Sequence, residues 1–237
     1  MSSFNYSFTG VPVSIETHYS MIHELCEEYR SVQSPVMTIQ TTEQDILAEK
    51  EPLYNTIQRP SSKAYLETLA VQRKLTEALL DYDTILFHSS ALAVDGQGYL
   101  FAALSGTGKS THARLWREVF GDRVTMINDD KPFIHIGEDE VRVYGSPWDG
   151  KHHLSTNTSV PVKAICILTR DTTNHIEKIS PQNAFSVLFQ QTYRSKDPAK
   201  LAKTMDLIIR MTEMVSLYRL GCNMDPEAAR VSYEGMK

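Results

Sequence analysis

Two closely spaced glycines in the middle of the chain are followed at once by a lysine and two hydroxyl residues. The run is Ala-Leu-Ser-Gly-Thr-Gly-Lys-Ser-Thr, residues 103–111. Glycines at this spacing let the backbone turn tightly, so that successive N–H groups can point at the oxygens of an anion. Such a turn leading into a helix is typical of a phosphate-binding loop (P-loop), because the helix adds its positive dipole end. In this interpretation Lys109 neutralises the β and γ phosphates of a nucleoside triphosphate, and the Ser110 hydroxyl binds Mg²⁺.

The predicted nucleotide-binding residues are the loop and the first residues of its helix: Ser105, Gly106, Thr107, Gly108, Lys109, Ser110 and Thr111. One position departs from the strict P-loop pattern, which has glycine where Ala103 stands. Alanine is compatible with that position if its φ angle stays negative at the end of a strand. The alternative is an ordinary glycine-rich turn that contains Lys-Ser, but an apolar run before the loop and a helical pattern after it favour the P-loop.

Two adjacent carboxylates, Asp129 and Asp130, follow a short apolar run that ends at Ile127. A carboxylate at the end of the strand beside a P-loop strand is well placed to hold the magnesium ion of a bound nucleotide. A second carboxylate can accept the proton of an attacking hydroxyl group. The residues alone do not assign the two roles, and a solvated turn with two aspartates is the alternative. His88 lies just before the P-loop strand, and a histidine there would by itself more often be structural.

The elements that must position these residues can be predicted from hydrophobic periodicity and turn signals. Around the P-loop we expect strands over residues 85–94, 99–104, 124–127, 133–136, 141–144 and 164–169, a turn at 95–98 and a helix at 109–120. The last third is predicted to be helical, because Ser-Pro at 180–181 and Asp-Pro at 197–198 and 225–226 pair a capping residue with a proline that suits the first helical turn. Val215 is expected on the second of these helices.

Residues 1–82 carry a different pattern and form the predicted N-terminal α+β part. Strands are expected over 4–8 and 11–15, a short helix over 18–30, a strand over 36–47, and a helix from Ser61 or Ser62 to about Tyr82. A boundary near residue 83 separates this part from a P-loop domain over 83–237, although both can belong to one continuous domain. The predicted fold class is α/β with α+β character: a P-loop core, the small N-terminal part and a helical C-terminal third.

The composition narrows the classes of partner. The chain has 237 residues with 24 basic and 29 acidic side chains, for a formal net charge of −5, and it contains no Lys/Arg run. Nucleic-acid-binding proteins are usually basic, so no nucleic acid is expected as a partner. The three cysteines are far apart and offer no metal-ligand spacing. Without a signal-peptide pattern or an apolar run of about 20 residues, the protein is expected in the cytoplasm, away from membranes.

Together these features resemble the HPr kinase/phosphorylase family and its wider superfamily with ATP-dependent phosphoenolpyruvate carboxykinase. The matching segments are His88-Ser89, residues 95–98 and 104–110, and Asn128-Asp-Asp130, within residues 83–170. The resemblance implies the P-loop core of the HPr kinase C-terminal domain. It also implies roles: Asp129 as the base that acts on the acceptor hydroxyl, Asp130 as a metal ligand, and His88 as a group that supports the base.

The match to that family has departures. His88 is followed by serine rather than glycine, Lys131 alone supplies the family's basic residue after the two aspartates, and the family's glycine-rich signature further along is absent. In its place stands Gly-Ser-Pro-Trp-Asp-Gly-Lys, residues 145–151, which looks like the form in small HPr kinase-like proteins of uncertain substrate. Loops of this kind often carry binding groups. The residues predicted to contact the nucleotide or the acceptor are Lys131, Trp148, Asp149 and Lys151; a structural turn anchored by a packed Trp148 is the alternative.

The function that these observations imply is that of an ATP- and Mg²⁺-dependent kinase. The γ-phosphoryl group would pass to a hydroxyl, either a serine of a protein or peptide or a small alcohol. A nucleotide-binding regulator without turnover is the alternative from another class, and a carboxykinase is less favoured because such enzymes are much longer chains. The acceptor, the choice between ATP and another nucleoside triphosphate, reverse phosphorolysis and assembly into a homo-oligomer stay open.

Overall fold

The computed structural model describes residues 2–50 and 62–237, and the chain divides into two compact units, residues 1–82 and 83–237. The described residues of unit 1 contain a three-stranded sheet in the order β1-β2-β3. β1 and β2 form a hairpin through a turn in which Thr9 and Gly10 both have positive φ angles, and β3 runs parallel to β2. The strands and α-helices described in this unit are β1 (Ser2–Phe8), β2 (Val11–Thr17), α1 (Met21–Leu25), β3 (Met37–Gln40), α2 (Glu43–Ala48) and α4 (Lys63–Leu79).

A buried carboxylate ties the sheet of unit 1 to its helix α4. Glu67 on α4 is fully buried. It accepts hydrogen bonds from the N–H groups of His18 and Tyr19, both at 2.8 Å, and from the hydroxyl of Thr41 at 2.6 Å. A carboxylate removed from water needs such donors to offset the lost hydration. The bonds therefore fix the ends of β2 and β3 against α4.

The strand predicted over residues 36–47 is wrong in its second half. β3 ends at Gln40, and the following residues form helix α2. Thr42 caps this helix in a capping box, because its hydroxyl accepts from the N–H of Asp45 (3.2 Å) while the Asp45 carboxylate accepts from the N–H of Thr42 (2.9 Å). These local bonds satisfy the first turn of a helix and override the strand pattern.

The predicted helices of unit 1 differ from the observed ones in extent. The helix expected over 18–30 is shorter, since α1 ends at Leu25 and a 3₁₀ turn follows over Glu27–Tyr29. Ser62 caps α4, with its hydroxyl accepting from the N–H of Tyr65 at 3.2 Å. Ser61, the other predicted cap, lies outside the described residues.

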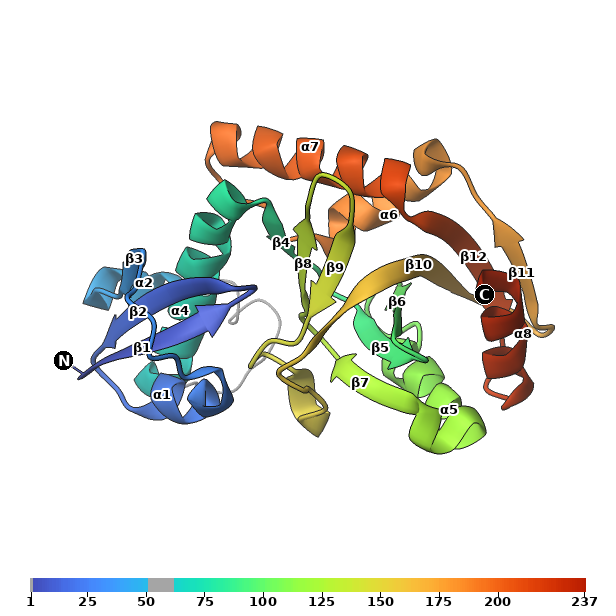
Figure 1. The fold of residues 1–237 in the computed structure, drawn as a ribbon, viewed down its shortest axis with the longest axis horizontal. Coiled ribbons are helices and arrows are strands. Elements are labelled where there is room, and N and C mark those ends of the chain that lie inside the picture. Colours follow the sequence, from blue (N-terminus) through green and yellow to red (C-terminus); the bar gives the residue numbers. More distant parts are fainter. Residues whose placement is uncertain (1, 51–61) are drawn as a thin grey trace. The chain divides into compact units, whose positions relative to one another are not determined.

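Unit 2, which is described throughout, contains one nine-stranded sheet. Its order is β4-β8-β9-β10-β6-β5-β7, and β12 pairs with both β10 and β11. β10 joins the two halves of the sheet: residues 159–161 pair antiparallel with β9, and the remainder runs parallel to β6 and β12 (Figure 1). The strands are β4 (Thr84–Leu86), β5 (Ser90–Val94), β6 (Gln97–Ala102), β7 (Val124–Asn128), β8 (Phe133–Ile136), β9 (Val141–Tyr144), β10 (Ser159–Arg170), β11 (His175–Lys178) and β12 (Ser216–Cys222).

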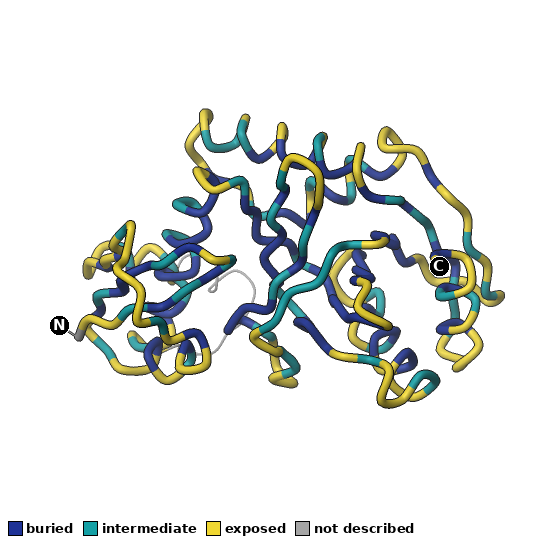
Figure 2. Tube along the Cα trace, in the orientation of Figure 1, coloured by how far each residue is buried: buried dark blue, intermediate teal, exposed yellow. Residues whose placement is uncertain are grey.

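Helices cover both faces of this sheet. α6 (Pro181–Gln191) and α7 (Pro198–Met214) lie on one face, and α5 (Lys109–Phe120) and α8 (Glu227–Met236) lie on the other (Figure 1). The inner strands β5 and β6 are buried along almost their whole length (Figure 2). No helix within residues 2–50 and 62–237 is long and apolar enough to cross a membrane.

One apolar core of unit 2 lies between the sheet and the helices α5 and α8. Trp116 on α5 is fully buried at its centre and packs edge-on against the ring of Phe101 on β6. Its indole N–H donates to Nε2 of His112 (3.1 Å) and to the hydroxyl of Ser232 on α8 (2.9 Å). A buried indole N–H needs a partner, so these bonds fix the position of α5 against α8.

The single strand predicted over residues 85–94 is two strands, β4 and β5, separated by residues 87–89. In this break the backbone bonds to other segments instead of to a neighbouring strand. The N–H of His88 donates to the carbonyl of Gln191 (2.7 Å), and the N–H of Ser89 donates to the carbonyl of Asp130 (3.1 Å). The strands predicted over 124–127, 133–136, 141–144 and 164–169 are confirmed within β7 to β10, and β6 covers most of the strand predicted over 99–104.

The prediction that the last third is helical is wrong for two strands, β11 and β12. Val215 follows the end of α7 rather than lying on it, and β12 begins at the next residue. A helix that runs directly into a buried parallel strand leaves no turn signal in the sequence, which explains the error. The predicted starts of α6 and α7 are confirmed, because Ser180 and Asp197 cap these helices with their side chains. α8 begins one residue later than predicted, with Pro226 rather than Asp225 as its N-cap.

Candidate active site

The segment between β6 and α5 has the backbone of a P-loop. Gly106 and Gly108 have φ angles of +78° and +126°, and a Cβ at Gly106 would meet no atom within 4 Å. These glycines are therefore required by the backbone conformation rather than by crowding around a side chain. Ala103 has no positive φ angle, so alanine is accommodated there without strain. No acceptor in the described part of the chain takes a hydrogen bond from the N–H of Ser105, Gly106 or Gly108, and these donors fit an anion.

Lys109, the first residue of α5, is held inside this loop. It is 9% exposed, and its Nζ donates to the carbonyl of Ala103 at 3.2 Å. Burial lowers the pKa of this lysine, while the carboxylates of Asp130 and Asp129 oppose the shift. An ammonium group beside open N–H donors fits the β and γ oxygens of a triphosphate, which can form charge-assisted hydrogen bonds to it.

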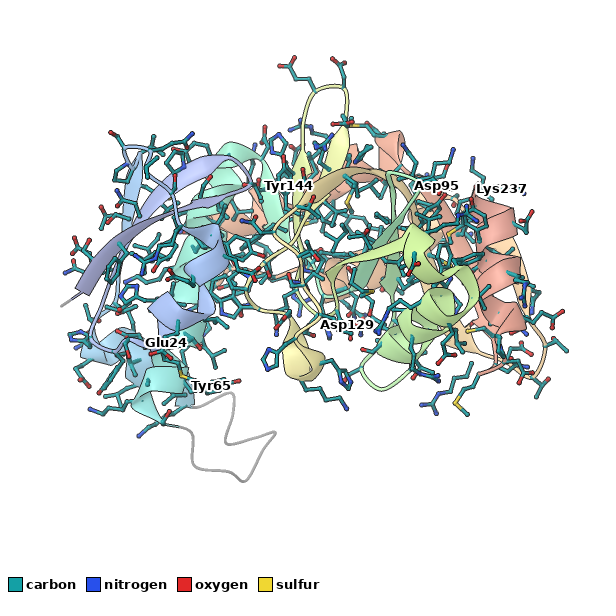
Figure 3. All side chains as sticks on the ribbon, turned by 60° about the horizontal axis from the view of Figure 1, so that its bottom comes forward. Glu24, Tyr65, Asp95, Asp129, Tyr144 and Lys237 are labelled. Carbon is teal, nitrogen blue, oxygen red and sulfur yellow. The ribbon has the colours of Figure 1, made fainter. Side chains whose placement is uncertain are left out.

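Asp129 follows β7 directly and lies near the start of α5 (Figure 3). It is 7% exposed, and its Oδ1 accepts a hydrogen bond from the hydroxyl of Ser90 at 2.6 Å. Ser90 comes from β5, the strand that pairs with β7. One oxygen of the carboxylate is thus fixed by the neighbouring strand.

Asp130 has different partners. Its Oδ1 lies 3.2 Å from Nε2 of His88, and its Oδ2 lies 3.0 Å from Nζ of Lys131. Burial raises the pKa of this carboxyl, but the hydrogen bond from His88 and the charge of Lys131 outweigh burial and hold the pKa at about 2. Asp130 is therefore an anion near neutral pH, as a ligand for a hard cation needs to be.

The pairing of His88 corrects one implication of the sequence resemblance. That resemblance places His88 in support of Asp129, whereas the structure pairs its side chain with Asp130. The reason lies in the break between β4 and β5, where the N–H of Ser89 bonds to the carbonyl of Asp130 at 3.1 Å and holds the preceding residue beside that aspartate. The hydrogen-bond partner of Asp129 is Ser90, which sequence reasoning did not select.

Asn128 directs the two carboxylates apart. It is fully buried at the end of β7, and its Oδ1 accepts from the N–H groups of Asp130 (2.8 Å) and Lys131 (2.7 Å). Its Nδ2 donates to the carbonyl of Ser146 at 2.9 Å. An asparagine that bonds to the backbone two and three residues further on forms a turn and ends the strand. Asp129 and Asp130 therefore leave the strand in different directions.

The predicted substrate loop, residues 145–151, folds against Asp130. Gly150 has a φ angle of +76°, and a Cβ there would lie 3.1 Å from the Cβ of Asp130, so a larger residue would crowd the aspartate. Trp148 is 7% exposed and packs edge-on against Phe133, with ring centroids 6.3 Å apart. Trp148 therefore anchors the loop inside the fold, as the structural alternative expects.

A cavity of about 630 Å³ opens on the side of the P-loop that faces the aspartates, and we call it the charged cavity. Its lining consists of His88, Ser105, Gly106, Gly108, Lys109, Ser110, Thr111, Arg114, Arg117, Asp129, Asp130, Lys151, His152 and Leu154. The predicted catalytic residues and all the predicted nucleotide-binding residues except Thr107 thus meet in one space. Of the predicted substrate residues, Lys151 lines this cavity. Lys131 bonds to Asp130, and Asp149 bonds to Nδ1 of His153 (3.1 Å).

The charged cavity also has suitable groups for Mg²⁺. No group of three or more His, Cys, Asp or Glu side chains within the described ranges could hold a metal ion. A magnesium ion in a nucleotide site needs no such group, because it takes one or two carboxylates together with phosphate oxygens and water. Ser110 and Asp130, both in the lining, fit that requirement.

A second cavity, of about 470 Å³, lies on the opposite side of the P-loop, and we call it the apolar cavity. Its lining consists of Gly106, Thr107, Gly108, Thr111, His112, Leu115, Leu168, Arg170, Asp171, Cys222, Asn223 and Met224. Apolar walls with a few polar groups are typical of sites for small organic ligands. The two cavities share Gly106, Gly108 and Thr111, so one ligand could occupy both by crossing the loop.

His112, in the lining of the apolar cavity, has a buried ring nitrogen without a partner among the described residues. Burial lowers the pKa of this histidine to about 3, so its ring is neutral near pH 7. Because Nε2 accepts the indole N–H of Trp116, Nδ1 carries the proton in this arrangement. Nδ1 is buried and has no hydrogen-bond partner among the described residues.

Comparisons with known proteins add little to this geometry. No protein-family model matches the sequence. No curated protein matches it either. One solved structure with a similar chain path is the HPr(Ser) kinase/phosphatase from Coxiella burnetii, with a TM-score of 0.38 and 8% identity over 63% of this chain and 95% of that chain. These values indicate at most a distant similarity of fold.

Two residues that sequence reasoning did not select hold the P-loop from outside. Arg170, at the end of β10, donates from Nη2 to the carbonyl of Gly106 (2.5 Å) and from Nε to that of Thr107 (3.4 Å). Gln191, at the end of α6, can donate from its amide nitrogen to the carbonyl of Ala103 (3.1 Å) and to Nδ1 of His88 (3.2 Å). Both are more than 60 residues from the loop, and no local pattern could have identified them.

Arg114 and Arg117 were also not selected, although the sequence contains a signal for them. They follow Ser110 by four and seven residues, so all three lie on one face of α5. That face lines the charged cavity. The spacing from Ser110, taken together with the P-loop, is therefore enough to predict both arginines beside the site.

Proposed function

We propose that unit 2 is a Mg²⁺-dependent kinase that transfers the γ-phosphoryl group of a nucleoside triphosphate, with ATP as the first candidate, to a hydroxyl group. One observation carries the proposal: a P-loop with available N–H donors, Lys109 and two carboxylates line the same cavity. Phosphoryl transfer depends mainly on positioning and charge stabilisation, and these are the groups that supply both.

The two cavities suggest how the nucleotide would lie. The loop N–H groups and Lys109 would bind the β and γ phosphates, with the nucleoside in the apolar cavity, where Leu115 and Leu168 offer apolar contacts. The γ phosphate would then face Asp129 and Asp130 in the charged cavity. An acceptor would approach from the same side, because the nucleoside occupies the other.

Transfer in this arrangement is an in-line displacement. The acceptor oxygen forms a bond to the γ phosphorus while the bond from that phosphorus to the β–γ bridging oxygen breaks, and the nucleoside diphosphate leaves with the electron pair. The proton of the acceptor hydroxyl passes to the carboxylate of Asp129, which Ser90 holds in place. Ser110 and Asp130 would hold Mg²⁺, which neutralises charge on the phosphates when bound.

The low pKa of Asp130 supports this division of roles. A carboxyl group with a pKa of about 2 is a weak proton acceptor and a suitable anionic metal ligand. The Asp129 carboxylate accepts one hydrogen bond, from Ser90, and carries no ion pair with a described residue. Asp129 is therefore the better candidate for the base.

A product screen tests the proposal. The protein would be incubated with MgATP and a panel of serine peptides and small alcohols, with detection of ADP release and of the mass gain of one phosphoryl group. We expect Mg²⁺-dependent transfer to at least one panel member and its loss in Asp129→Asn. The matched control is Asp206→Asn, an exposed aspartate on α7, which should behave as wild type. MgATP binding without ADP release or product would contradict the kinase and favour a nucleotide-binding regulator.

A further inference from the structure

Basic side chains line the charged cavity beyond the P-loop itself. Arg114 and Arg117 come from the face of α5 that carries Ser110, and Lys151 comes from the loop that packs against Asp130. The cavity is lined by four cationic side chains, counting Lys109, and by two carboxylates, those of Asp129 and Asp130. Cations from two separate elements therefore converge on one space.

The distance along α5 separates these arginines from the bound phosphates. A helix rises 1.5 Å per residue, so Arg114 begins about 7.5 Å and Arg117 about 12 Å from the level of Lys109. The phosphates would bind at the N-terminal end of the helix, at the loop. Long side chains on a helix lean toward its N-terminus, which directs both arginines back over the cavity rather than away from it.

Ion pairs within the protein neutralise only part of the positive charge that lines the cavity. Arg114 forms an ion pair with Glu118 on the next turn. No hydrogen bond or ion pair to another described residue involves the side chains of Arg117 and Lys151, and both residues are exposed. A solvated helix face could carry one such cation without a function. Two such cations from separate elements, lining one cavity beside a candidate base, are better explained by an anionic ligand.

We infer that the acceptor of the proposed phosphoryl transfer carries an anionic group, a carboxylate or a phosphate, close to its reactive hydroxyl. This inference rests on the proposed kinase activity and names the class of its substrate. Arg117 and Lys151 bind the anionic group, while the hydroxyl lies at Asp129. A hydroxy acid and a serine flanked by acidic residues share this chemistry.

The first part of the test compares matched acceptors in the transfer assay. One series contains serine peptides flanked by glutamate, glutamine or lysine, and the other contains glycerate and glycerol. Wild type should transfer to the anionic member of a series with a kcat/KM at least tenfold above that of the neutral member, the size expected for a charge-assisted hydrogen bond. Equal use of neutral and anionic members would overturn the inference and leave the kinase intact.

Variants identify the side chains responsible. Arg117→Ala and Lys151→Ala should each raise the KM for the anionic acceptor by roughly tenfold, with the KM for MgATP unchanged. Arg117→Glu should shift the preference toward the lysine-flanked peptide, and Arg117→Lys should retain part of the wild-type preference. Arg230→Ala, at an exposed arginine on α8, is the matched control. An equal rise in the KM for MgATP would assign Arg117 to the triphosphate and contradict the inference.

A binding measurement separates this inference from the kinase proposal. The glutamate-flanked and glutamine-flanked peptides would be titrated by calorimetry into wild type loaded with Mg²⁺ and a non-hydrolysable ATP analogue. Tighter binding of the glutamate peptide that Arg117→Ala and Lys151→Ala abolish, without transfer in the first assay, would support the anion site and reject the kinase. Absence of both binding and transfer for every acceptor would reject both.

Discussion

The two cavities at the P-loop share one helix and differ in the chemistry of their walls. Ser110, Arg114 and Arg117 of α5 face the charged cavity, whereas His112 and Leu115 face the apolar cavity. This division follows from the helical period, which places residues three, four or seven positions apart on one face, so that residues 110, 114 and 117 share one face and residues 112 and 115 share another. The charged cavity has two carboxylates and several cations. The apolar cavity is lined by Leu115, Leu168 and a neutral His112, and its two charged residues, Arg170 and Asp171, are of opposite sign.

The difference between the two cavities favours one orientation for a nucleotide bound across the loop. Placing phosphates in the apolar cavity would remove their charges from water without enough cations to offset the loss. A nucleobase in the charged cavity would displace water from the cationic side chains and would not replace the hydrogen bonds that this water makes to them. In the proposed function, the walls around the loop, more than the loop itself, would therefore determine the orientation of the nucleotide.

The largest expected effect comes from substitution of the aspartates that line the charged cavity. Asp129→Asn should leave MgATP affinity nearly unchanged and lower the rate of transfer by roughly 10²–10⁴-fold, because general-base catalysis is lost. Asp130→Asn should instead weaken Mg²⁺-dependent nucleotide binding, since a hard cation loses an anionic ligand. His88→Ala should resemble a mild Asp130 change, because His88 contacts that residue. Calorimetry with MgATP and single-turnover assays would measure both quantities.

The opposite pattern for the two aspartates would reverse their roles. If Asp129→Asn lost MgATP binding and Asp130→Asn lost only turnover, His88 and Asp130 would form the base, in agreement with their 3.2 Å contact. Transfer at the wild-type rate in both variants would mean that neither aspartate is catalytic. Asp206→Asn serves as the control here as well.

The second prediction tests the part that both cavities share. Lys109→Ala should weaken binding of ATP and of inorganic tripolyphosphate alike, by roughly 10- to 100-fold, the range for lost hydrogen bonds to a charged group. Titration calorimetry would measure both ligands, with Lys163→Ala, an exposed lysine on β10, as the matched control. Unchanged affinity for both ligands would show that the loop does not bind phosphates.

The third prediction concerns pH and the wall of the apolar cavity. His112 has a pKa of about 3 in the folded protein and 6.5 in the reference state, so the unfolded chain binds its proton first as pH falls. The stability contributed by the neutral ring is therefore complete above pH 6.5 and is lost progressively between pH 6.5 and about 3. At pH 5 the expected loss is roughly 2 kcal/mol.

Denaturant unfolding at pH 7 and pH 5 would measure this loss. Both tryptophans, Trp116 and Trp148, belong to unit 2, so their fluorescence follows that unit. His112→Gln should remove most of the difference between the two pH values, whereas His175→Gln, at an exposed histidine on β11, should not. The same pH dependence in wild type and His112→Gln would exclude this histidine as its source.

The smallest expected effect comes from a substitution at the edge of the apolar cavity. Met224 is 76% exposed at the edge of the apolar cavity, where a bound base could cover it. Met224→Ala should weaken ATP binding about fourfold, equivalent to one methylene group returned to water at ~0.8 kcal/mol, and leave tripolyphosphate binding unchanged. Equal weakening of both ligands, or of neither, would show that the base does not contact this residue.

The parts of the site that the sequence predicted are those with a local origin. The P-loop needs two glycines and a lysine within a few residues, and Asp129 and Asp130 directly follow the strand that carries them. Each of these patterns is complete within a short stretch, and the backbone angles of Gly106 and Gly108 agree with it. The fold class, the strands around the loop and the starts of the later helices were predictable for the same reason.

The parts that the sequence did not predict depend on contacts between distant segments. Ser90 bonds to Asp129 across a strand pair, Gln191 reaches the P-loop from α6, and Arg170 reaches it from β10. The partner of His88 depends on the break between β4 and β5, which hydrophobicity alone does not reveal. Periodicity reports the faces of an element and gives no information on which other element covers them.

Helix α8 has a consequence for the order in which the site is built during synthesis. The indole of Trp116 on α5 bonds to Ser232, 116 residues further along the chain. Contacts between such distant residues cannot form until the later segment has left the ribosome. A nascent chain that stops before residue 227 contains every P-loop residue, yet α5 has no α8 to pack against. If unit 2 binds a nucleotide as proposed, the bound ligand would stabilise it fully only after this last helix has been made.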